Sequence, residues 1–275
     1  MTSPQHNPAG IAELSQVRAR LRLTGSDRVT FLHGQCTNDV KNLAVGQNCY
    51  AAFLNAKGKM RGEGHIICTP DSFLLEVNPG LVASLEKFII TEDVTIEDIS
   101  TMTGEWLVIG EVSAGLPAKA MTFGHPLGLG VLADGAMTET INADELEVLR
   151  VEAGVPKWGA DMDENTIPNE AGLEARAINY DKGCYIGQET IARIKTYGHV
   201  NRQLIQCVVG GGQMPKRGDK IFAGDREVGQ VTSTVFSSRL GKPLALGYVR
   251  REFATAGVTL NWNNEIVEVL RVCGG

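Results

Sequence analysis

The sequence predicts an α+β protein of several lobes, with an α+β insert in its first half and an antiparallel β-barrel at its C-terminus. Three observations predict this class. Strand-like and helix-like patterns alternate over about the first 135 residues. The clearest helix of the sequence follows near residue 143, and beyond residue 201 short β-rich runs are separated by turns. A chain of 275 residues is long enough for about two or three domains.

The first 48 residues are expected to form a strand and a helix after a loose tail of ten residues. Residues 17–23 have a strand-like pattern, and the Thr-Gly-Ser-Asp loop at 24–27 offers N-cap residues. Val29, Leu32 and Cys36 then recur at the spacing of one helical face.

Residues 49–135 are expected to form a β–helix–β insert lobe. Apolar runs at 66–68 and 73–75 flank a Thr-Pro-Asp-Ser turn, and this arrangement predicts a hairpin. Two more strands are expected at 94–96 and 106–109.

A helix is expected inside this insert, between the hairpin and the later strands. Asn78 and Pro79 provide a cap and a first-turn proline for it. Its apolar stripe consists of Val82, Leu85 and Phe88 or Ile89. Glycines and prolines between residues 110 and 135 are expected to break any long regular element.

The helix near residue 143 has recognisable ends. Asn142 and Glu145 have the spacing of a capping box in which Asn replaces Ser or Thr, and Gly154 with Pro156 ends the helix. Its apolar face consists of Leu146, Leu149 and Ala153. Further on, residues 203–275 are expected to form a small antiparallel barrel or sandwich. The β-rich runs that predict it lie at 204–209, 228–235, 244–250 and 266–272.

Composition and charge exclude several classes of protein. The formal net charge is −6, which argues against a general binder of nucleic acid or anionic membranes, because such binding needs cations. The N-terminus has no secretory pattern, and no apolar run approaches the ~20 residues of a membrane span. The six cysteines include no C-x-x-C pair and show no zinc or iron–sulfur spacing. We therefore expect a cytoplasmic protein with no membrane partner and no metal site.

Two adjacent segments carry candidate functional residues. The first is an acidic loop that contains Asp161, Asp163, Glu164 and Glu170. It lacks the residue pattern of an EF-hand calcium loop, and a solvated acidic loop is the alternative. The second segment places Cys184 between two glycines, on a turn that leads into a helix. A thiolate there is favoured by the helix dipole and by Lys182, with an inert packed cysteine as the alternative.

Residues 182–189, Lys-Gly-Cys-Tyr-Ile-Gly-Gln-Glu, resemble the K-G-C-[YF]-x-G-Q-E motif of the YgfZ-like folate-binding proteins. These proteins share a superfamily with the glycine cleavage T-protein, an aminomethyltransferase. Residues 150–170 resemble the superfamily loop that ends in P-x-E, and residues 31–40 resemble its F-L-x-G-Q-x-T-N-D-V stretch. The similarity extends over most of the chain.

The resemblance implies a three-lobed cloverleaf around a central folate-sized hole. Its first lobe would be discontinuous and would join residues 1–48 to residues 136–202, with the P-x-E loop and the Cys184 motif. Residues 49–135 would form a ferredoxin-like β–α–β insert, and residues 203–275 the antiparallel barrel.

The resemblance also implies that tetrahydrofolate, or a one-carbon derivative of it, is the cofactor. Glu170, the P-x-E glutamate, would anchor the pterin, because a carboxylate can accept two parallel N–H bonds. Trp158 would pack on the ligand, with plain core packing as the alternative. The other cofactor-binding residues that we expect are Asp161, Tyr185, Gln188 and Arg193.

One departure from the superfamily argues against one-carbon transfer. T-proteins carry a G-G-[IL]-[IL]-D-D-L motif near the reactive nitrogens of folate, and here its acidic pair is replaced by Gly62-Glu63. Glutamate is one methylene longer than aspartate, and errors of about 1 Å can lower a rate about 100-fold. A folate-dependent aminomethyltransferase or demethylase-like enzyme is therefore the alternative function.

The YgfZ-like branch is associated with maintaining iron–sulfur enzymes, including those that thiolate tRNA. The resemblance thus implies a folate-binding accessory protein whose functional thiol is Cys184, supported by Lys182, and whose partners are iron–sulfur assembly or client proteins. One thiolate is too few ligands to hold a cluster, so transient ligation, thiol exchange and redox protection all stay open. A third hypothesis is direct tRNA binding, to which we give least weight. It would use Arg202, Lys216, Arg217, Arg250 and Arg251.

Overall fold

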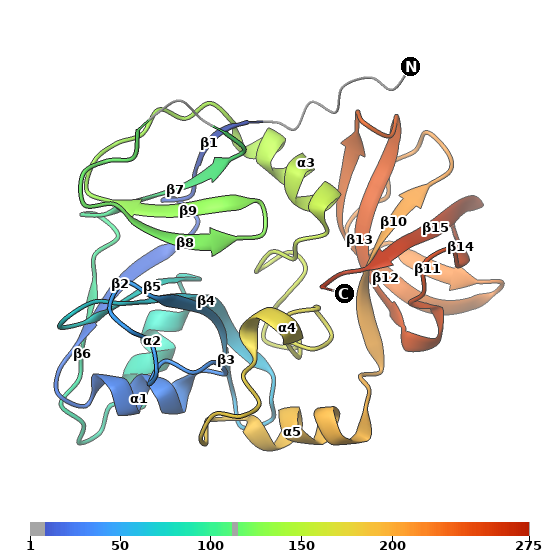
Figure 1. Cartoon of the computed structure of the whole chain (residues 1–275). Coiled ribbons are helices and arrows are strands. Elements are labelled where there is room, and N and C mark those ends of the chain that lie inside the picture. The colour runs from blue at the N-terminus through green and yellow to red at the C-terminus, as the bar shows by residue number, and fades with distance from the viewer. Residues whose placement is uncertain (1–8, 112–114, 275) are drawn as a thin grey trace.

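The computed structural model describes residues 9–111 and 115–274, which form two antiparallel sheets and a closed barrel (Figure 1). The two sheets lie one above the other at the left of the view, and the barrel lies at the right. Residues 154–187 run through the space between these three bodies. None of the described helices combines the length and apolar character that a membrane crossing requires.

The five-stranded sheet has the order β3-β4-β5-β2-β6. Its strands are β2 (Ala19–Thr24), β3 (Asn48–Leu54), β4 (Met60–Cys68), β5 (Phe73–Val77) and β6 (Thr95–Asp98). The helices α1 (Arg28–Gln35) and α2 (Leu81–Glu86) pack on it, and their leucines share one core with Leu21, Phe53 and Leu75. The expected hairpin is confirmed, because β4 and β5 pair antiparallel with Cys68 opposite Phe73.

The expected cap of α2 is wrong. Gly80, not Asn78, precedes the first helical residue, and it makes no side-chain cap. The Asn78 carboxamide instead accepts a hydrogen bond of 3.0 Å from the Glu63 backbone N–H. Asn78 therefore joins β4 to the start of α2, because a buried backbone donor needs an acceptor more than the short helix needs a cap.

The four-stranded sheet has the order β1-β7-β9-β8. Its strands are β1 (Gly10–Glu13), β7 (Gly104–Ile109), β8 (Met121–His125) and β9 (Gly128–Ala133). β1 pairs with β7, and β2 pairs with both β5 and β6, so strands from before residue 49 complete sheets built mostly from residues 49–135. Each sheet thus contains residues from both sides of the expected boundary at residue 49. The division into three lobes at the expected residues stays a prediction.

The helix α3 (Ala143–Ala153) begins with the expected capping box. The Asn142 side chain accepts from the Glu145 N–H, and the Glu145 carboxylate accepts from the Asn142 N–H. Gly154 ends the helix with φ 68°, a conformation that favours glycine. Val151 on α3 packs with Leu204 and Leu244, so that α3 lies against the barrel. Two shorter helices follow, α4 (Glu174–Ala177) and α5 (Gln188–Tyr197).

The expected C-terminal barrel is confirmed as a closed antiparallel barrel with the order β10-β13-β12-β11-β14-β15. Its strands are β10 (Arg202–Val209), β11 (Lys220–Ala223), β12 (Arg226–Ser237), β13 (Lys242–Arg250), β14 (Thr259–Trp262) and β15 (Glu265–Val272). A 3₁₀ turn, Arg251–Phe253, follows β13. Ile205, Val249 and Val269 are buried in the interior, as the inward positions of a small barrel should be.

Candidate functional site

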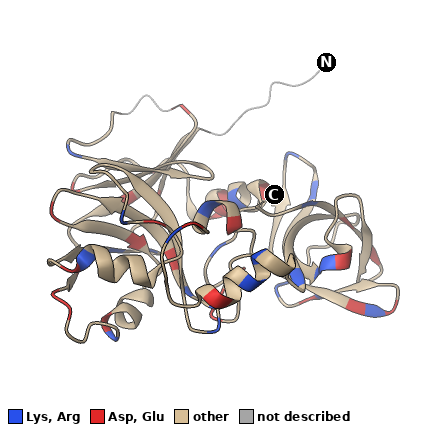
Figure 2. Cartoon of the chain, turned by 60° about the horizontal axis from the view of Figure 1, so that its bottom comes forward, with Lys and Arg blue, Asp and Glu red and all other residues tan. Residues whose placement is uncertain are grey.

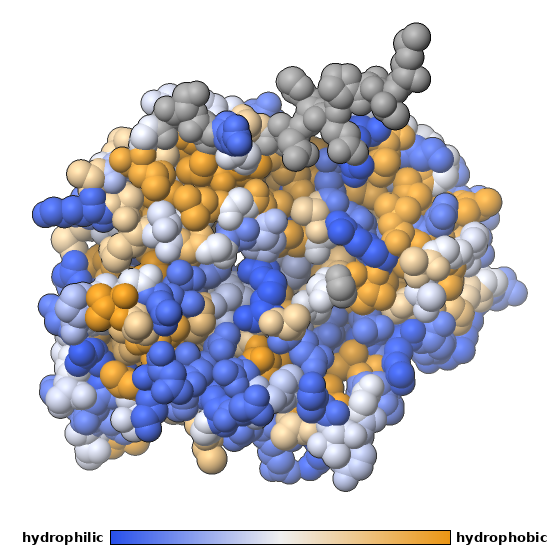
Figure 3. Space-filling model, viewed as in Figure 1, coloured by the Kyte–Doolittle hydropathy of each residue, from blue (hydrophilic) through white to orange (hydrophobic). Residues whose placement is uncertain are grey.

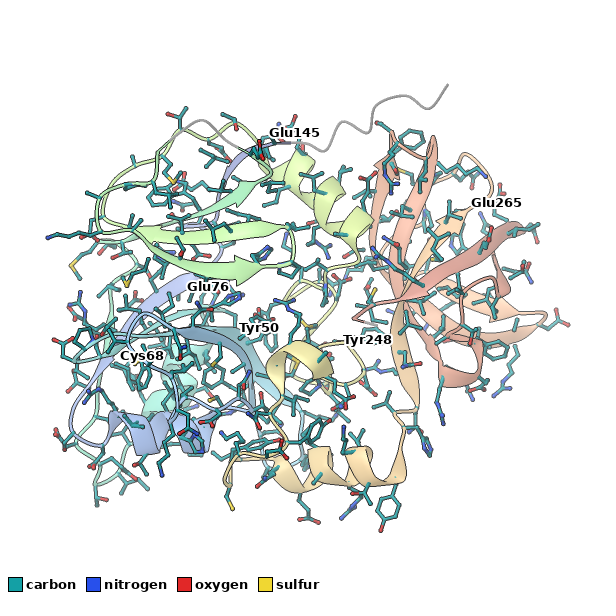
Figure 4. The ribbon with its side chains drawn as sticks, in the orientation of Figure 1. Tyr50, Cys68, Glu76, Glu145, Tyr248 and Glu265 are labelled. Carbon is teal, nitrogen blue, oxygen red and sulfur yellow. The ribbon has the colours of Figure 1, made fainter. Side chains whose placement is uncertain are left out.

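A cavity of about 200 Å³ lies where the two sheets meet α3 and the segment after it. This volume is many times the ~10–15 Å³ that one water needs. Figure 4 places Tyr50 and Glu76 where the two sheets face each other, and Figure 3 shows polar residues around the middle of this face, between the sheets and the barrel. The polar and aromatic residues that line the cavity include Arg18, Tyr50, Glu63, Glu76, Trp158 and Arg176.

Arg18 organises the polar wall of this cavity. Its guanidinium contacts the carboxylates of Glu63 and Glu76, which project from neighbouring strands β4 and β5. The Tyr50 hydroxyl donates a 2.7 Å hydrogen bond to Glu63. Burial and the negative charge of Glu63 raise the pKa of Tyr50 well above its usual value, so Tyr50 stays a hydrogen-bond donor. The wall therefore presents one cation held between two buried carboxylates.

His65 extends this network toward the four-stranded sheet. Its Nδ1 lies 2.9 Å from a Glu76 oxygen, and its Nε2 lies 3.0 Å from the backbone oxygen of Gly124 in β8. Burial alone would raise the pKa of Glu76, but Arg18 and the His65 hydrogen bond outweigh it and lower that pKa. Glu76 is thus ionised and ties the two sheets together through the imidazole.

Glu105 is a buried carboxyl that belongs to the same wall. It lines the cavity from β7, is fully buried, and neither of its oxygens accepts a hydrogen bond from a described residue. Burial, followed by the negative charge of Glu76, raises its pKa well above the usual value. This shift favours the protonated form of Glu105, which can donate a hydrogen bond where the ionised Glu76 can only accept.

Apolar and aromatic groups form the rest of the cavity wall. Leu107, Ile141 and Leu146 come from β7, the loop before α3 and α3 itself. Arg176 from α4 places its guanidinium 4.5 Å from the centre of the Tyr50 ring, a cation–π distance. The combination of flat apolar surface with both charge signs suits a planar heterocycle that carries N–H donors and an anionic tail.

The sequence-predicted site residues do not all meet at this cavity. Trp158 lines it and is half-buried, so packing on a ligand stays a prediction beside the alternative of core packing. Asp161 is buried instead in a hydrogen-bond cluster with Arg150, Thr232 and Ser233, and it joins the acidic loop to α3 and the barrel. The alternative of a solvated acidic loop therefore holds only in part. Asp163 and Glu164 are exposed, but Asp161 is buried in an ion pair with Arg150.

Glu170 lies outside the cavity lining. Its side chain is largely buried, and one oxygen accepts hydrogen bonds of 3.1 and 3.0 Å from the Nε and Nη2 atoms of Arg202 on β10. The Arg202 guanidinium also stacks 4.5 Å from the Tyr248 ring centre. The carboxylate therefore faces the barrel in this conformation.

The Cys184 segment forms a second group of predicted residues, beside α1 and before α5. Cys184 is exposed, whereas Lys182 is buried and donates hydrogen bonds of 2.6 and 2.7 Å to the carbonyls of His33 and Cys36. Burial lowers the pKa of Lys182. The Lys182 ammonium is thus committed to the C-terminal end of α1, where it satisfies carbonyls that a helix leaves open.

The other motif residues shape this turn. Tyr185 is buried beneath the Lys182 ammonium, 4.9 Å from ring centre to Nζ. Gly187 has φ 84°, and a Cβ there would lie 2.6 Å from the Asn55 carbonyl oxygen, so only glycine fits before α5. Gln188 begins α5 half-buried, while Arg193 pairs with Glu189 on its exposed face.

Sequence reasoning missed most of the cavity's charged wall. In the sequence, Glu63 was singled out only because it corresponds to the acidic pair of the T-protein motif. Arg18, Glu76 and Glu105 were not singled out. A usable signal was present, because Glu76 and Glu105 interrupt otherwise apolar strands. A charged residue at such a position is either paired or functional. Among the described residues, no cluster of three or more His, Cys, Asp or Glu side chains could hold a metal ion.

Comparisons with known proteins agree on one superfamily. The model of the glycine cleavage T-protein C-terminal barrel domain matches residues 202–267. An uncharacterised protein of Haemophilus influenzae is 30% identical over 78% of this chain and 81% of its own. The tRNA-modifying protein YgfZ of Escherichia coli is 27% identical over 78% of this chain and 77% of its own. The crystal structure of the glycine cleavage system aminomethyltransferase T from Bartonella henselae has a TM-score of 0.80 at 17% identity, over 97% of this chain and 86% of that chain.

Proposed function

The chain belongs to the YgfZ-like branch of the glycine cleavage T-protein superfamily, and from this we propose that it binds a reduced folate in the cavity between its two sheets. The observation that carries the proposal is the lining itself, where Trp158 and Tyr50 stand beside the buried Arg18–Glu63–Glu76 cluster. A flat ring with N–H donors needs both an aromatic surface and fixed acceptors, and this wall supplies both.

Each part of a reduced folate has a matching group in the lining. The pterin amino and ring N–H groups can donate to the Glu63 carboxylate, whose position Arg18 and Tyr50 fix. Leu107 and Ile141 offer an apolar surface for the benzoyl ring. Arg176, which also lines the cavity, can pair with the carboxylates of the glutamate tail.

The role of Glu170 as a pterin anchor stays a prediction. In its present conformation the carboxylate pairs with Arg202, so an anchor role requires that it exchange this partner for the pterin. Glu63 is the competing anchor, because it already faces the cavity. Substitution of each glutamate by glutamine separates the two roles.

Isothermal titration calorimetry with tetrahydrofolate tests the proposal. We expect Trp158→Ala to weaken binding about tenfold or more, because the aromatic surface is removed. Glu63→Gln should weaken it by a similar factor, while Glu170→Gln does so only if the exchange occurs. The matched control is Phe236→Ala, which removes an exposed aromatic residue from β12, away from the cavity. Equal affinity of wild type and Trp158→Ala for tetrahydrofolate would contradict the site.

We further propose that the protein acts as an accessory factor for iron–sulfur enzymes, including those of tRNA modification, and that Cys184 is its functional thiol. The exposure of Cys184 supports contact with a partner, in contrast to the buried Cys36 and Cys207. A cluster bound at Cys184 would need ligands from that partner, because the described residues provide no group of three. We expect Cys184→Ala to fold normally and to fail in a cellular assay of iron–sulfur enzymes. Full complementation by the variant would contradict the role of the thiol.

The second candidate function is one-carbon transfer by an aminomethyltransferase-like or demethylase-like reaction. It is favoured by the placement of Glu63 in the cavity wall, at the position of the T-protein acidic pair. The test is formation of methylenetetrahydrofolate from an aminomethylated carrier protein or a methylated amine. Turnover that Glu63→Ala abolishes would establish this function in place of the accessory role.

A further inference from the structure

A second pocket, of about 370 Å³, lies between α4, the end of α5 and the start of the barrel. Figure 2 shows α5 across the front of the molecule, with its last turn beside the barrel. The pocket is separate from the cavity described above and shares no lining residue with it. Its polar lining residues are Asn169, Glu174, Lys195, His199, Gln203 and Arg251.

Three basic side chains of this pocket come from different parts of the chain. Lys195 belongs to α5, His199 follows that helix, and Arg251 begins the 3₁₀ turn after β13. Lys195 is positioned by the Tyr180 ring, whose centre lies 4.5 Å from the Nζ atom. None of the three forms an ion pair with a carboxylate within residues 9–111 and 115–274, although nearby Arg193 and Arg202 do. The pocket thus brings together two cations, Lys195 and Arg251, without a carboxylate partner in the described part of the chain, while the Glu174 carboxylate in its lining accepts from Asn169 and Tyr180.

Asn169 adds a buried acceptor without a donor. It is 8% exposed, and its Nδ2 donates hydrogen bonds of 3.0 Å to Glu174 and 3.2 Å to the Tyr180 hydroxyl. These two bonds fix which end of the carboxamide is the oxygen. The Oδ1 atom has no partner among the described residues, and an unsatisfied buried acceptor destabilises a fold. A donor from outside the chain would complete this site.

We propose that this pocket binds a sugar phosphate through its phosphate and one of its free hydroxyls, as ribose phosphates offer. The phosphate oxygens would face Lys195 and Arg251, since these groups donate charge-assisted hydrogen bonds. A sugar hydroxyl would donate to Asn169 Oδ1, which an anion without an O–H group cannot do. A free sugar phosphate and an RNA strand both carry this chemistry.

Calorimetry at one fixed ionic strength tests the proposal with ribose 5-phosphate as the probe. We expect Lys195→Gln and Arg251→Gln each to weaken binding about tenfold. The control Lys242→Gln removes one positive charge from an exposed residue of β13 outside the pocket, and its affinity should stay within about twofold of wild type. No binding of ribose 5-phosphate by wild type, or equal weakening in the control, would overturn the proposal.

The role of Asn169 has its own readout, the preference for ribose 5-phosphate over sulfate, an anion without an O–H donor. Wild type should bind ribose 5-phosphate the more tightly, and Asn169→Ala should remove that preference while circular dichroism confirms its fold. Equal affinity of wild type for the two ligands would contradict the hydroxyl contact even if Asn169→Ala does not fold.

A short single-stranded RNA then distinguishes the two sources of the ligand. Tighter binding of RNA than of ribose 5-phosphate, weakened by Arg251→Gln but not by Lys242→Gln, would identify an RNA strand. Binding of ribose 5-phosphate alone would identify a free sugar phosphate. RNA binding that both variants weaken equally would show a general electrostatic field and would overturn the proposed site.

Discussion

At the scale of single residues, Glu105 shows how burial sets a protonation state in the cavity wall. The carboxyl is fully buried, and its pKa is raised by burial and then by the charge of Glu76. In the unfolded chain it has an ordinary carboxyl pKa, so between that value and the raised one the folded state binds the extra proton. The free energy of unfolding of the wild type therefore falls as the pH rises through this window.

Glu105→Gln should remove this loss of stability, because the amide has the shape of the carboxyl and needs no proton to stay neutral. We expect the variant to match wild type near pH 4 and to become more stable than wild type as the pH rises toward 7. The difference should grow by up to about 1.4 kcal/mol per pH unit within the window. Urea denaturation at a series of pH values measures it.

The control for Glu105→Gln is Glu268→Gln, on an exposed position of β15, where the difference from wild type should stay within about 0.5 kcal/mol. A Glu105→Gln variant that loses stability relative to wild type between pH 5 and pH 7 would show that the buried carboxyl is ionised in the fold.

At the scale of secondary-structure elements, α3 depends on its first turn. The reciprocal bonds of Asn142 and Glu145 satisfy backbone N–H groups that a helix start leaves open. Asn142→Ala should lower the free energy of unfolding by about 1 kcal/mol, while Asn142→Asp should retain most of it. Thermal denaturation measures both, and an equal loss in the two variants would mean that the cap contributes through something other than its acceptor oxygen.

The elements that could be predicted from the sequence are those stabilised by residues close to one another along the chain. The capping box of α3 and the hairpin β4–β5 are confirmed because their signals lie within a few residues of each other. The hairpin of β8 and β9 was not anticipated, because glycines interrupt it. Gly130 leaves room for the Phe123 ring, since a Cβ there would lie 2.1 Å from it. Because glycine stands where a β-branched or apolar residue would have indicated a strand, the sequence pattern did not predict one.

At the scale of the whole molecule, the cavity could not be predicted from local patterns. Motif resemblance identified the superfamily and the barrel, and alternation placed most strands. The wall, however, combines Arg18 with Glu76 and Glu105, which lie in or beside strands of two different sheets. Which strands become neighbours depends on long-range pairing, such as β2 beside β5 and β1 beside β7. Alternation of apolar residues contains no information on that pairing.

Asp161 joins the acidic loop to α3 and to the barrel, and this leads to a prediction at the largest scale. Its Oδ2 accepts from Arg150 on α3 at 2.7 Å, and its Oδ1 accepts from Thr232 and Ser233 on β12 at 2.5 and 2.8 Å. Asp161→Asn would leave the buried guanidinium of Arg150 with only Glu147 as a charged partner. We expect the free energy of unfolding to fall by about 3 kcal/mol, because removal of one member of a buried ion pair leaves the other uncompensated.

The matched control is Asp163→Asn, two residues along the same loop, where the carboxylate is exposed and only stabilises the turn to Asn165 and Thr166. Its effect should stay below about 1 kcal/mol. Urea denaturation followed by tryptophan fluorescence measures both variants, and calorimetry with tetrahydrofolate on the folded protein completes the test. If Asp161 is a connector, Asp161→Asn is destabilised but binds tetrahydrofolate within a few-fold of wild type. A large loss of affinity without a loss of stability would instead restore Asp161 to the cofactor-binding role that the sequence predicts.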